Sequence, residues 1–152
     1  MKKNIYIALI KTLKSVFDTA SPLSIQAKMS LSASILGCSF PNWNFCGFYI
    51  ATKKNALEIG PYYGSMIPCT HIAYGKGVCG TAAERREIII VDNVHNYNNY
   101  ISCDSETKSE IVVPVFEREI LKAVLDIDSM EEADFGKADK IYLEKICTLI
   151  SK

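Results

Sequence analysis

The sequence predicts a single α+β domain in which an antiparallel sheet is flanked by helices on one face. Three observations support this prediction: 49% of the 152 residues are apolar, helical periodicity marks both ends of the chain, and short apolar runs with polar turns fill its middle. We expect N-terminal helices in residues 1–37, a sheet with its ligand loops in residues 43–129, and a C-terminal helix in residues 136–152.

Helices are predicted near both termini. Apolar residues recur at helical spacing over residues 6–17, and this first helix should end within residues 18–21. Residues 23–36 alternate like a strand but also have one apolar helical face. Because β-branched residues are scarce there, we expect a helix. Apolar positions with helical spacing in residues 142–150 predict the last helix.

The middle of the chain predicts two hairpins and one further strand. Residues 45–50 and 56–59 are apolar runs separated by the polar turn TKKN, which is typical of a hairpin. Residues 111–116 and 121–127 are separated by EREI and form a second hairpin, and residues 87–91 predict a strand before it.

A long polar stretch, VDNVHNYNNYISCDSETKSE, leads into the second hairpin. Connections of this length are uncommon and often functional, and this one contains aromatic residues and a cysteine. If it folds over the sheet face that the helices leave open, it forms a pocket. We expect the ligand there.

A glycine-rich segment, GKGVCGTAAE, precedes a run of good helix formers. The start of such a helix presents free backbone N–H groups that could hold a carboxylate or a phosphate, although a plain turn before a helix fits equally well. Cys79 lies at this helix start, which could lower the pKa of its thiol.

Charge and composition exclude several function classes. The 17 basic and 17 acidic residues cancel without forming a Lys/Arg stripe, so we expect neither nucleic acid nor an anionic membrane as a partner. No apolar run is long enough to span a bilayer and the N-terminus lacks the features of a secretory signal, so we expect a cytoplasmic protein. The six cysteines form no CxxC pair and the chain has only two histidines, His71 and His95, so no metal site is predicted.

Two carboxylates share one face of the last predicted strand. Side chains alternate along a strand, so Asp126 and Asp128 face one way while Leu125 and Ile127 face the other. Glu110 lies at the start of the adjacent strand and would add a third acid. A solvated sheet face would also explain this pattern. If the three acids cluster, mutual repulsion keeps at least one protonated near neutral pH.

Four segments occur in a fixed order: GPYYG, GKGVCGTAAE, CDSETKSEIVVPV and LDIDS, with Cys69, Cys79 and Cys103 spaced by 10 and 24 residues. This combination resembles the free methionine-(R)-sulfoxide reductases, from about Asn44 to the C-terminal helix. The family has the GAF fold, an antiparallel sheet flanked by helices, which agrees with the layer prediction.

The resemblance implies a thiol mechanism without a bound cofactor. Cys103 would attack the sulfoxide sulfur and become a sulfenic acid, and Cys69 would resolve it to a Cys69–Cys103 disulfide, with Cys79 as a second or alternative partner. Thioredoxin, itself reduced by thioredoxin reductase and NADPH, would restore the thiols. The resemblance also suggests a homodimer. Cys38, Cys46 and Cys147 are interpreted as structural, buried cysteines.

The resemblance also implies how the substrate, free methionine sulfoxide, is held. Glu110, Asp126 and Asp128 would bind its ammonium group, and Asp128 would hand a proton to the sulfoxide oxygen. Tyr49 and Phe45 would enclose the methyl end. The family usually reads NWxGFY here and this chain reads NFCGFY, so Phe45 replaces a tryptophan and lacks its indole N–H.

Two other functions fit some of the same residues. A GAF domain can serve as a sensor module that binds a small molecule, because fold alone does not determine function. The cysteines could also form a redox sensor that reduces no substrate, but such a sensor would not explain three acids at the pocket.

Overall fold

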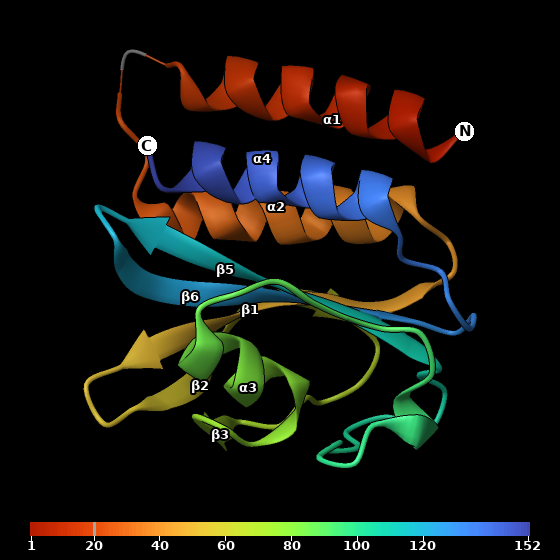
Figure 1. The fold of residues 1–152 in the computed structure, drawn as a ribbon. Coiled ribbons are helices and arrows are strands. Elements are labelled where there is room, and N and C mark those ends of the chain that lie inside the picture. The colour runs from red at the N-terminus through yellow and green to blue at the C-terminus, as the bar shows by residue number, and fades with distance from the viewer. Residues whose placement is uncertain (20) are drawn as a thin grey trace.

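The computed structural model describes residues 1–19 and 21–152, which form a twisted antiparallel sheet with a helical layer on one face and a shorter helix with loops on the other (Figure 1). Ala20, in the stretch where the first helix is predicted to end, lies outside the described residues. Within the described part of the chain, no helix is both long and apolar enough to cross a membrane.

Three long helices lie on one side of the sheet: α2 (Ile25–Ser39) and α4 (Lys137–Ile150) pack on it, and α1 (Lys2–Phe17) packs on these two helices (Figure 1). All three were predicted, although α4 begins earlier and α2 ends later than the periodicity indicated. Ser24 fixes the start of α2, because its side chain accepts a hydrogen bond from the Ala27 backbone N–H at 3.2 Å.

The described residues form a six-stranded sheet in the order β3-β2-β1-β6-β5-β4. Its strands are β1 (Trp43–Thr52), β2 (Ala56–Gly64), β3 (His71–Ala73), β4 (Ile89–Val91), β5 (Ser109–Glu117) and β6 (Ile120–Ser129). The two predicted hairpins are β1–β2 and β5–β6. The sequence did not predict β3, since three residues are too short to show a period.

A fourth helix, α3 (Gly77–Arg85), packs on the opposite face of the sheet (Figure 1). The prediction that helices cover one face is therefore correct for the three long helices and wrong for α3. Its small apolar side chains, among them Val78 and Ala82, join a second core cluster with Tyr49 and Val124 of the sheet. The long predicted loop also lies on this face and contains a short 3₁₀ turn, Val94–Asn96.

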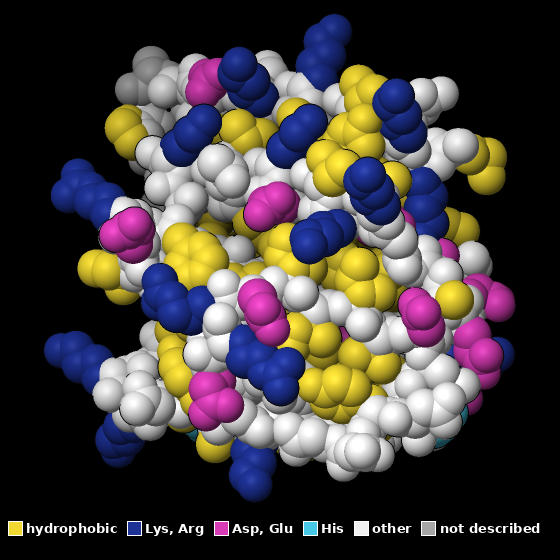
Figure 2. Space-filling view, viewed as in Figure 1, with side chains coloured by type: hydrophobic (Ala, Val, Ile, Leu, Met, Phe, Trp, Pro, Cys, Tyr) yellow, Lys and Arg dark blue, Asp and Glu magenta, His cyan; other side chains and the backbone are white. Residues whose placement is uncertain are grey.

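The sheet separates two apolar clusters. Phe48, Leu125 and Ile127 pack against the long helices, together with Cys46 and Cys147, which are buried as predicted. On the face shown in Figure 2, basic and acidic side chains are interspersed rather than gathered into a basic stripe.

Cys38 contradicts the prediction of a buried structural cysteine, because it is exposed. The buried face of α2 contains Met29, Ala33 and Leu36. Cys38 follows Leu36 by two positions, about 200° around the helix, and so faces away from the core.

A buried hydrogen bond joins the first and last helices. The Tyr6 hydroxyl donates to Asp139 Oδ1 at 2.7 Å, and Asp139 Oδ2 accepts from the Gly136 backbone N–H at 2.9 Å, just before α4. The Tyr6 ring stacks on Tyr142 with centroids 5.4 Å apart. One carboxylate thus both caps α4 and fixes α1 to it.

Tyr6→Phe should lower the free energy of unfolding by about 1.5–3 kcal/mol, because it removes a hydrogen bond to a buried carboxylate. Denaturant unfolding measures this change. Tyr142→Phe is the matched control: it leaves the Tyr6–Asp139 hydrogen bond in place and should change stability by less than about 0.5 kcal/mol. Equal losses in both variants would contradict the role of this hydrogen bond.

Candidate functional site

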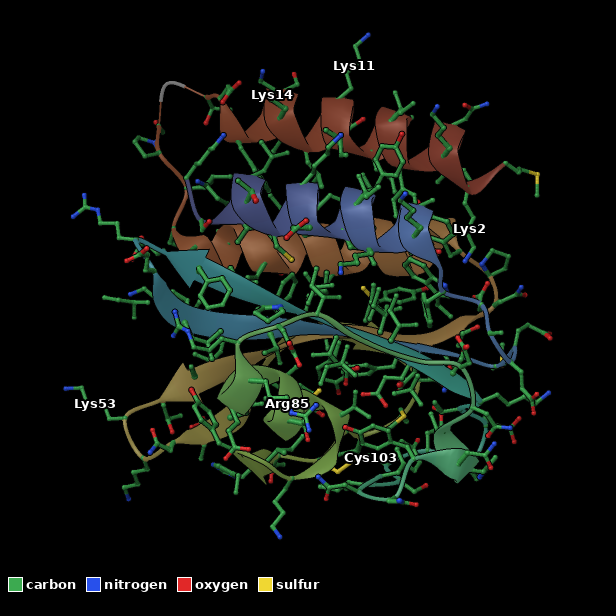
Figure 3. All side chains as sticks on the ribbon, viewed as in Figure 1. Lys2, Lys11, Lys14, Lys53, Arg85 and Cys103 are labelled. Atoms are coloured by element: carbon green, nitrogen blue, oxygen red, sulfur yellow. A yellow bond between two sulfur atoms is a disulfide. The ribbon has the colours of Figure 1, made fainter. Side chains whose placement is uncertain are left out.

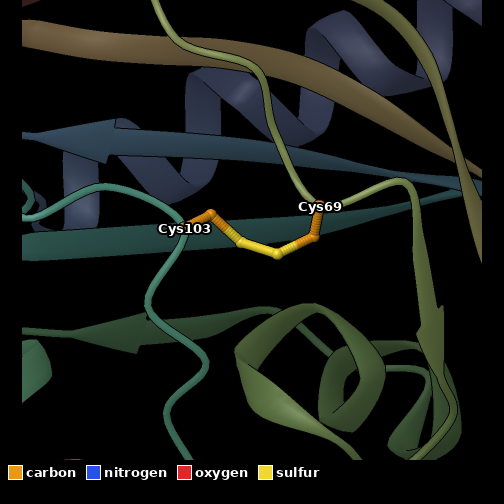
Figure 4. Close-up of a disulfide and its surroundings, with 2 residues drawn as sticks. All are labelled: Cys69 and Cys103. Atoms are coloured by element: carbon orange, nitrogen blue, oxygen red, sulfur yellow. A yellow bond between two sulfur atoms is a disulfide. The ribbon is translucent and has the colours of Figure 1, made fainter.

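A disulfide joins two loops on the α3 side of the sheet. Cys69 lies in the loop that follows β2 and Cys103 in the long loop before β5, with their Cα atoms 6.0 Å apart (Figure 4). In Figure 3, Cys103 lies across the sheet from Lys11 and Lys14 of α1. Both cysteine residues are half-buried.

The two linked loops, α3 and the sheet line a cavity of about 30 Å³. Seven of the eight residues predicted for the site line it, namely Phe45, Tyr49, Cys79, Cys103, Glu110, Asp126 and Asp128. The eighth, Cys69, is bonded to Cys103. Segments far apart in the sequence therefore meet at one pocket.

Sequence reasoning missed much of the apolar wall of this pocket. Met66, Pro68 and Ile72 come from the Cys69 loop and β3, while Tyr100 and Ile101 come from the long loop. The aromatic content of that loop was the only signal for these residues.

The register of the sheet brings the three carboxyl groups together. Asp128 of β6 pairs directly with Glu110 of β5, and Asp126 pairs with Val112 of β5 and with Gly47 of β1. Glu110, Asp126 and Asp128 are 5%, 6% and 9% exposed. They are not on a solvated sheet face, which was the alternative left by the sequence.

Burial raises the pKa of all three acids. The pKa values of Glu110 and Asp128 are well above their usual range, first because of burial and then because of the Asp126 charge. Burial raises the pKa of Asp126 to about 6, and hydrogen bonds with Cys79 and Glu110 limit the rise. Asp126 is therefore the first of the three to ionise, and its charge keeps its neighbours protonated.

A polar contact holds the Cys103 loop against β1. The Asn44 side-chain amide donates to Asp104 Oδ2 and to Thr107 Oγ1, each at 2.9 Å. Thr107 is 1% exposed, and its hydroxyl moderates the rise in the pKa of Asp128. Asn44 and Thr107 were not predicted as site residues, since neither carries reactive chemistry of its own.

The prediction of a lowered pKa for the Cys79 thiol is wrong. Cys79 lies in the first turn of α3 but is only 3% exposed, and burial raises its pKa well above the usual range, with Asp126 and Glu110 adding to the rise. Desolvation and two acids outweigh the helix end here.

Two glycines of the predicted glycine-rich segment have defined structural roles. Gly77 begins α3 with φ +61°, a conformation that favours glycine. A Cβ at Gly80 would lie 2.3 Å from the Ala73 carbonyl oxygen, so only glycine allows α3 to pack this closely on β3.

Phe45 occupies the aromatic position of the pocket. The residue is 2% exposed, and its ring centroid lies 6.4 Å from that of Tyr49 and 5.7 Å from that of Tyr62. A Cβ at Gly47 would lie 2.7 Å from Phe45 Cζ, so the ring fills space that a side chain there would take. Phe45 therefore gives the pocket an apolar wall but, unlike the tryptophan that it replaces, offers no indole N–H.

The two histidines are exposed and do not line the pocket. His71 Nε2 lies 3.7 Å from Glu58 Oε2 at the surface. Among the described residues, the group whose geometry could hold a metal ion comprises Cys79, Glu110 and Asp126.

The GAF domain family model matches residues 29–152. The chain is 43% identical over 138 residues to the free methionine-R-sulfoxide reductase of Saccharomyces cerevisiae, an alignment that covers 89% of this chain and 72% of the yeast protein.

Two solved structures are similar over almost the whole chain. The free methionine-R-sulfoxide reductase of Neisseria meningitidis, in complex with its substrate, matches with a TM-score of 0.91 at 31% identity. The match covers 99% of this chain and 89% of the Neisseria chain. The reduced form of fRMsr of Staphylococcus aureus has a TM-score of 0.89 at 37% identity, with coverage of 96% and 92%. This chain is therefore a GAF-domain protein that belongs to the free methionine-(R)-sulfoxide reductase family.

Proposed function

We propose that this protein reduces free methionine-(R)-sulfoxide to methionine, with Cys103 as the nucleophile and Cys69 as the resolving thiol. The observation that carries the proposal is the disulfide between two pocket loops, which lies beside three buried carboxyl groups. A redox pair and a cation-binding cluster in one pocket match a substrate that has both a sulfoxide and an ammonium group.

The acid cluster would select a free amino acid. Ionised Asp126 leaves a buried negative charge that needs a counter-charge, and the substrate ammonium supplies one. Protonated Glu110 and Asp128 would also contact the ammonium group, through their uncharged carboxyl oxygens. A methionine sulfoxide within a peptide has no ammonium and would leave Asp126 unpaired. The apolar end of the substrate would pack against Phe45 and Tyr49.

The reaction begins with two reduced cysteines. The Cys103 thiolate attacks the sulfoxide sulfur while the protonated carboxyl of Asp128 donates a proton to the sulfoxide oxygen, since oxygen leaves sulfur poorly as a bare anion. The oxygen passes to Cys103 as a sulfenic acid and methionine leaves. The methionine sulfur gains two electrons and the Cys103 sulfur loses two.

The second half of the reaction closes the disulfide. The Cys69 thiol attacks the sulfenic acid, the S–O bond breaks, and the hydroxyl leaves as water. Cys79 is a second partner for the sulfenic acid. A thioredoxin dithiol then reduces the Cys69–Cys103 disulfide by exchange and is itself regenerated by thioredoxin reductase and NADPH, in the cytoplasm.

The size of the cavity supports an order of events. About 30 Å³ has room for one or two waters, not for an amino acid. We therefore infer that the substrate enters only after the disulfide has been reduced and the two loops can separate.

Cys103→Ser should abolish methionine release in a single turnover without external reductant, because it removes the attacking sulfur. Cys69→Ser should still release one methionine per chain but should not turn over with thioredoxin. Released methionine is quantified by chromatography, with Cys38→Ser as the control because that thiol is exposed, forms no disulfide and lies outside the pocket. Exchanged outcomes would reverse the nucleophile assignment, and no release by the reduced wild type would favour a sensor.

Asp128→Asn should slow single-turnover methionine release by about 10²–10⁴-fold, the usual contribution of a general acid, because an amide cannot donate the proton. Stopped reactions at neutral pH measure this rate. Glu106→Gln is the matched control, an exposed carboxyl on the loop that carries Cys103, and it should leave the rate unchanged. An unaltered rate in Asp128→Asn would contradict the proton-donor role.

A further inference from the structure

Three side chains with metal-ligand atoms converge inside the pocket from three elements of the fold. Cys79 comes from α3, Glu110 from β5 and Asp126 from β6, and one ligand atom of each lies within 4.8 Å of the other two. The three residues are 3%, 5% and 6% exposed. Cys79 takes no part in the Cys69–Cys103 disulfide, so the cluster is complete in the oxidised protein.

One oxygen of this cluster lacks a partner. Asp126 Oδ1 is buried and has no hydrogen-bond partner among the described residues. An unsatisfied buried acceptor costs about 1–3 kcal/mol, so the site favours a ligand that contacts this oxygen. The substrate ammonium would do so during turnover, but the neighbouring thiol is only a weak hydrogen-bond acceptor for an ammonium, whereas it is a good ligand for a borderline-soft metal ion.

The dimensions of the cluster suit a metal ion. Three atoms no more than 4.8 Å apart all lie within about 2.8 Å of one common point. Zinc takes sulfur ligands at about 2.3 Å and carboxylate oxygens at about 2.0–2.2 Å, so each ligand atom needs to move by less than about 1 Å. The 30 Å³ cavity has room for the ion and one water.

We infer that Cys79, Glu110 and Asp126 form a binding site for Zn²⁺, which occupies the pocket in competition with the amino-acid ligand. One thiolate with two carboxylates is a borderline-soft ligand set, which favours Zn²⁺ over the oxygen-preferring Mg²⁺ and Ca²⁺. As it binds, the ion displaces the proton of the Cys79 thiol and the proton of the Glu110 carboxyl group to solvent, and a water completes its coordination. Zinc thereby blocks the acids and acts as a reversible inhibitor.

Zinc binding itself does not rest on the proposed function, because it needs only the three ligands. The competition does rest on it, since the carboxyl groups that would bind zinc are those proposed to hold the substrate ammonium. The two parts can therefore fail separately.

The test uses the oxidised, metal-free full chain, in which the Cys69–Cys103 disulfide keeps those two sulfurs from binding metal. Zn²⁺ is titrated against a chromophoric chelator, and Co²⁺ serves as a spectroscopic substitute that shows a thiolate charge-transfer band. We expect one Zn²⁺ per chain. Cys79→Ser and Asp126→Asn should each weaken binding at least tenfold, and Cys79→Ser should remove the cobalt band. Circular dichroism checks that both variants are folded.

Cys38→Ser is the matched control, because it removes an exposed thiol outside the pocket and should leave zinc affinity unchanged. Failure of the oxidised wild type to bind Zn²⁺, full affinity in Cys79→Ser, or loss of affinity in Cys38→Ser would each overturn the inference. Competition is measured in the Cys69→Ser/Cys103→Ser double variant, whose two loops can separate and which lacks both of those sulfurs as metal ligands. There, free methionine should raise the apparent Kd for zinc more than the same concentration of alanine, which corrects for chelation of zinc by a free amino acid. If zinc binds as described and methionine does not displace it, the metal site stands and the proposed placement of the ammonium is contradicted.

Discussion

Strand β6 lies between β1 and β5, and its alternating side chains determine what each face of the sheet can do. Leu125 and Ile127 pack in the core under the long helices, while Asp126 and Asp128 face the pocket. A slip of one residue would exchange these faces and place two carboxyl groups in the apolar layer, so the packing of the helices fixes the register. Pairing with β5 then sets Glu110 opposite Asp128.

The fold buries these three acids, and burial disfavours their ionised forms. Burial raises the pKa of each, and proton retention by Glu110 and Asp128 limits the repulsion that three adjacent carboxylates would suffer. Asp126 remains the acid that ionises most readily, with one oxygen unsatisfied. The pocket is thus prepared for a cation. A substrate ammonium and a zinc ion are two chemically different ways to meet the same requirement.

The sequence was informative where a local period or an intact motif decided the structure. Alternation along β6 predicted the shared acid face, while family resemblance, not spacing, selected the Cys69–Cys103 pair among six cysteines. Other features depend on packing that no local pattern shows. The pKa of Cys79 was predicted from its place at a helix start, whereas burial determines it. The family resemblance placed Cys79 in the same site as Glu110 and Asp126, but no local pattern did, because sheet pairing brings together residues that are far apart in the chain.

The most direct test of the proposed reductase function is which epimer of free methionine sulfoxide the protein consumes. Racemic free methionine sulfoxide is incubated with the protein, thioredoxin, thioredoxin reductase and NADPH, and both epimers are followed by chiral chromatography. Consumption should stop when half of the sulfoxide is gone, leaving the S epimer. Consumption of both epimers would contradict the stereochemical assignment, and no consumption with fully reduced thiols would contradict the reductase function itself.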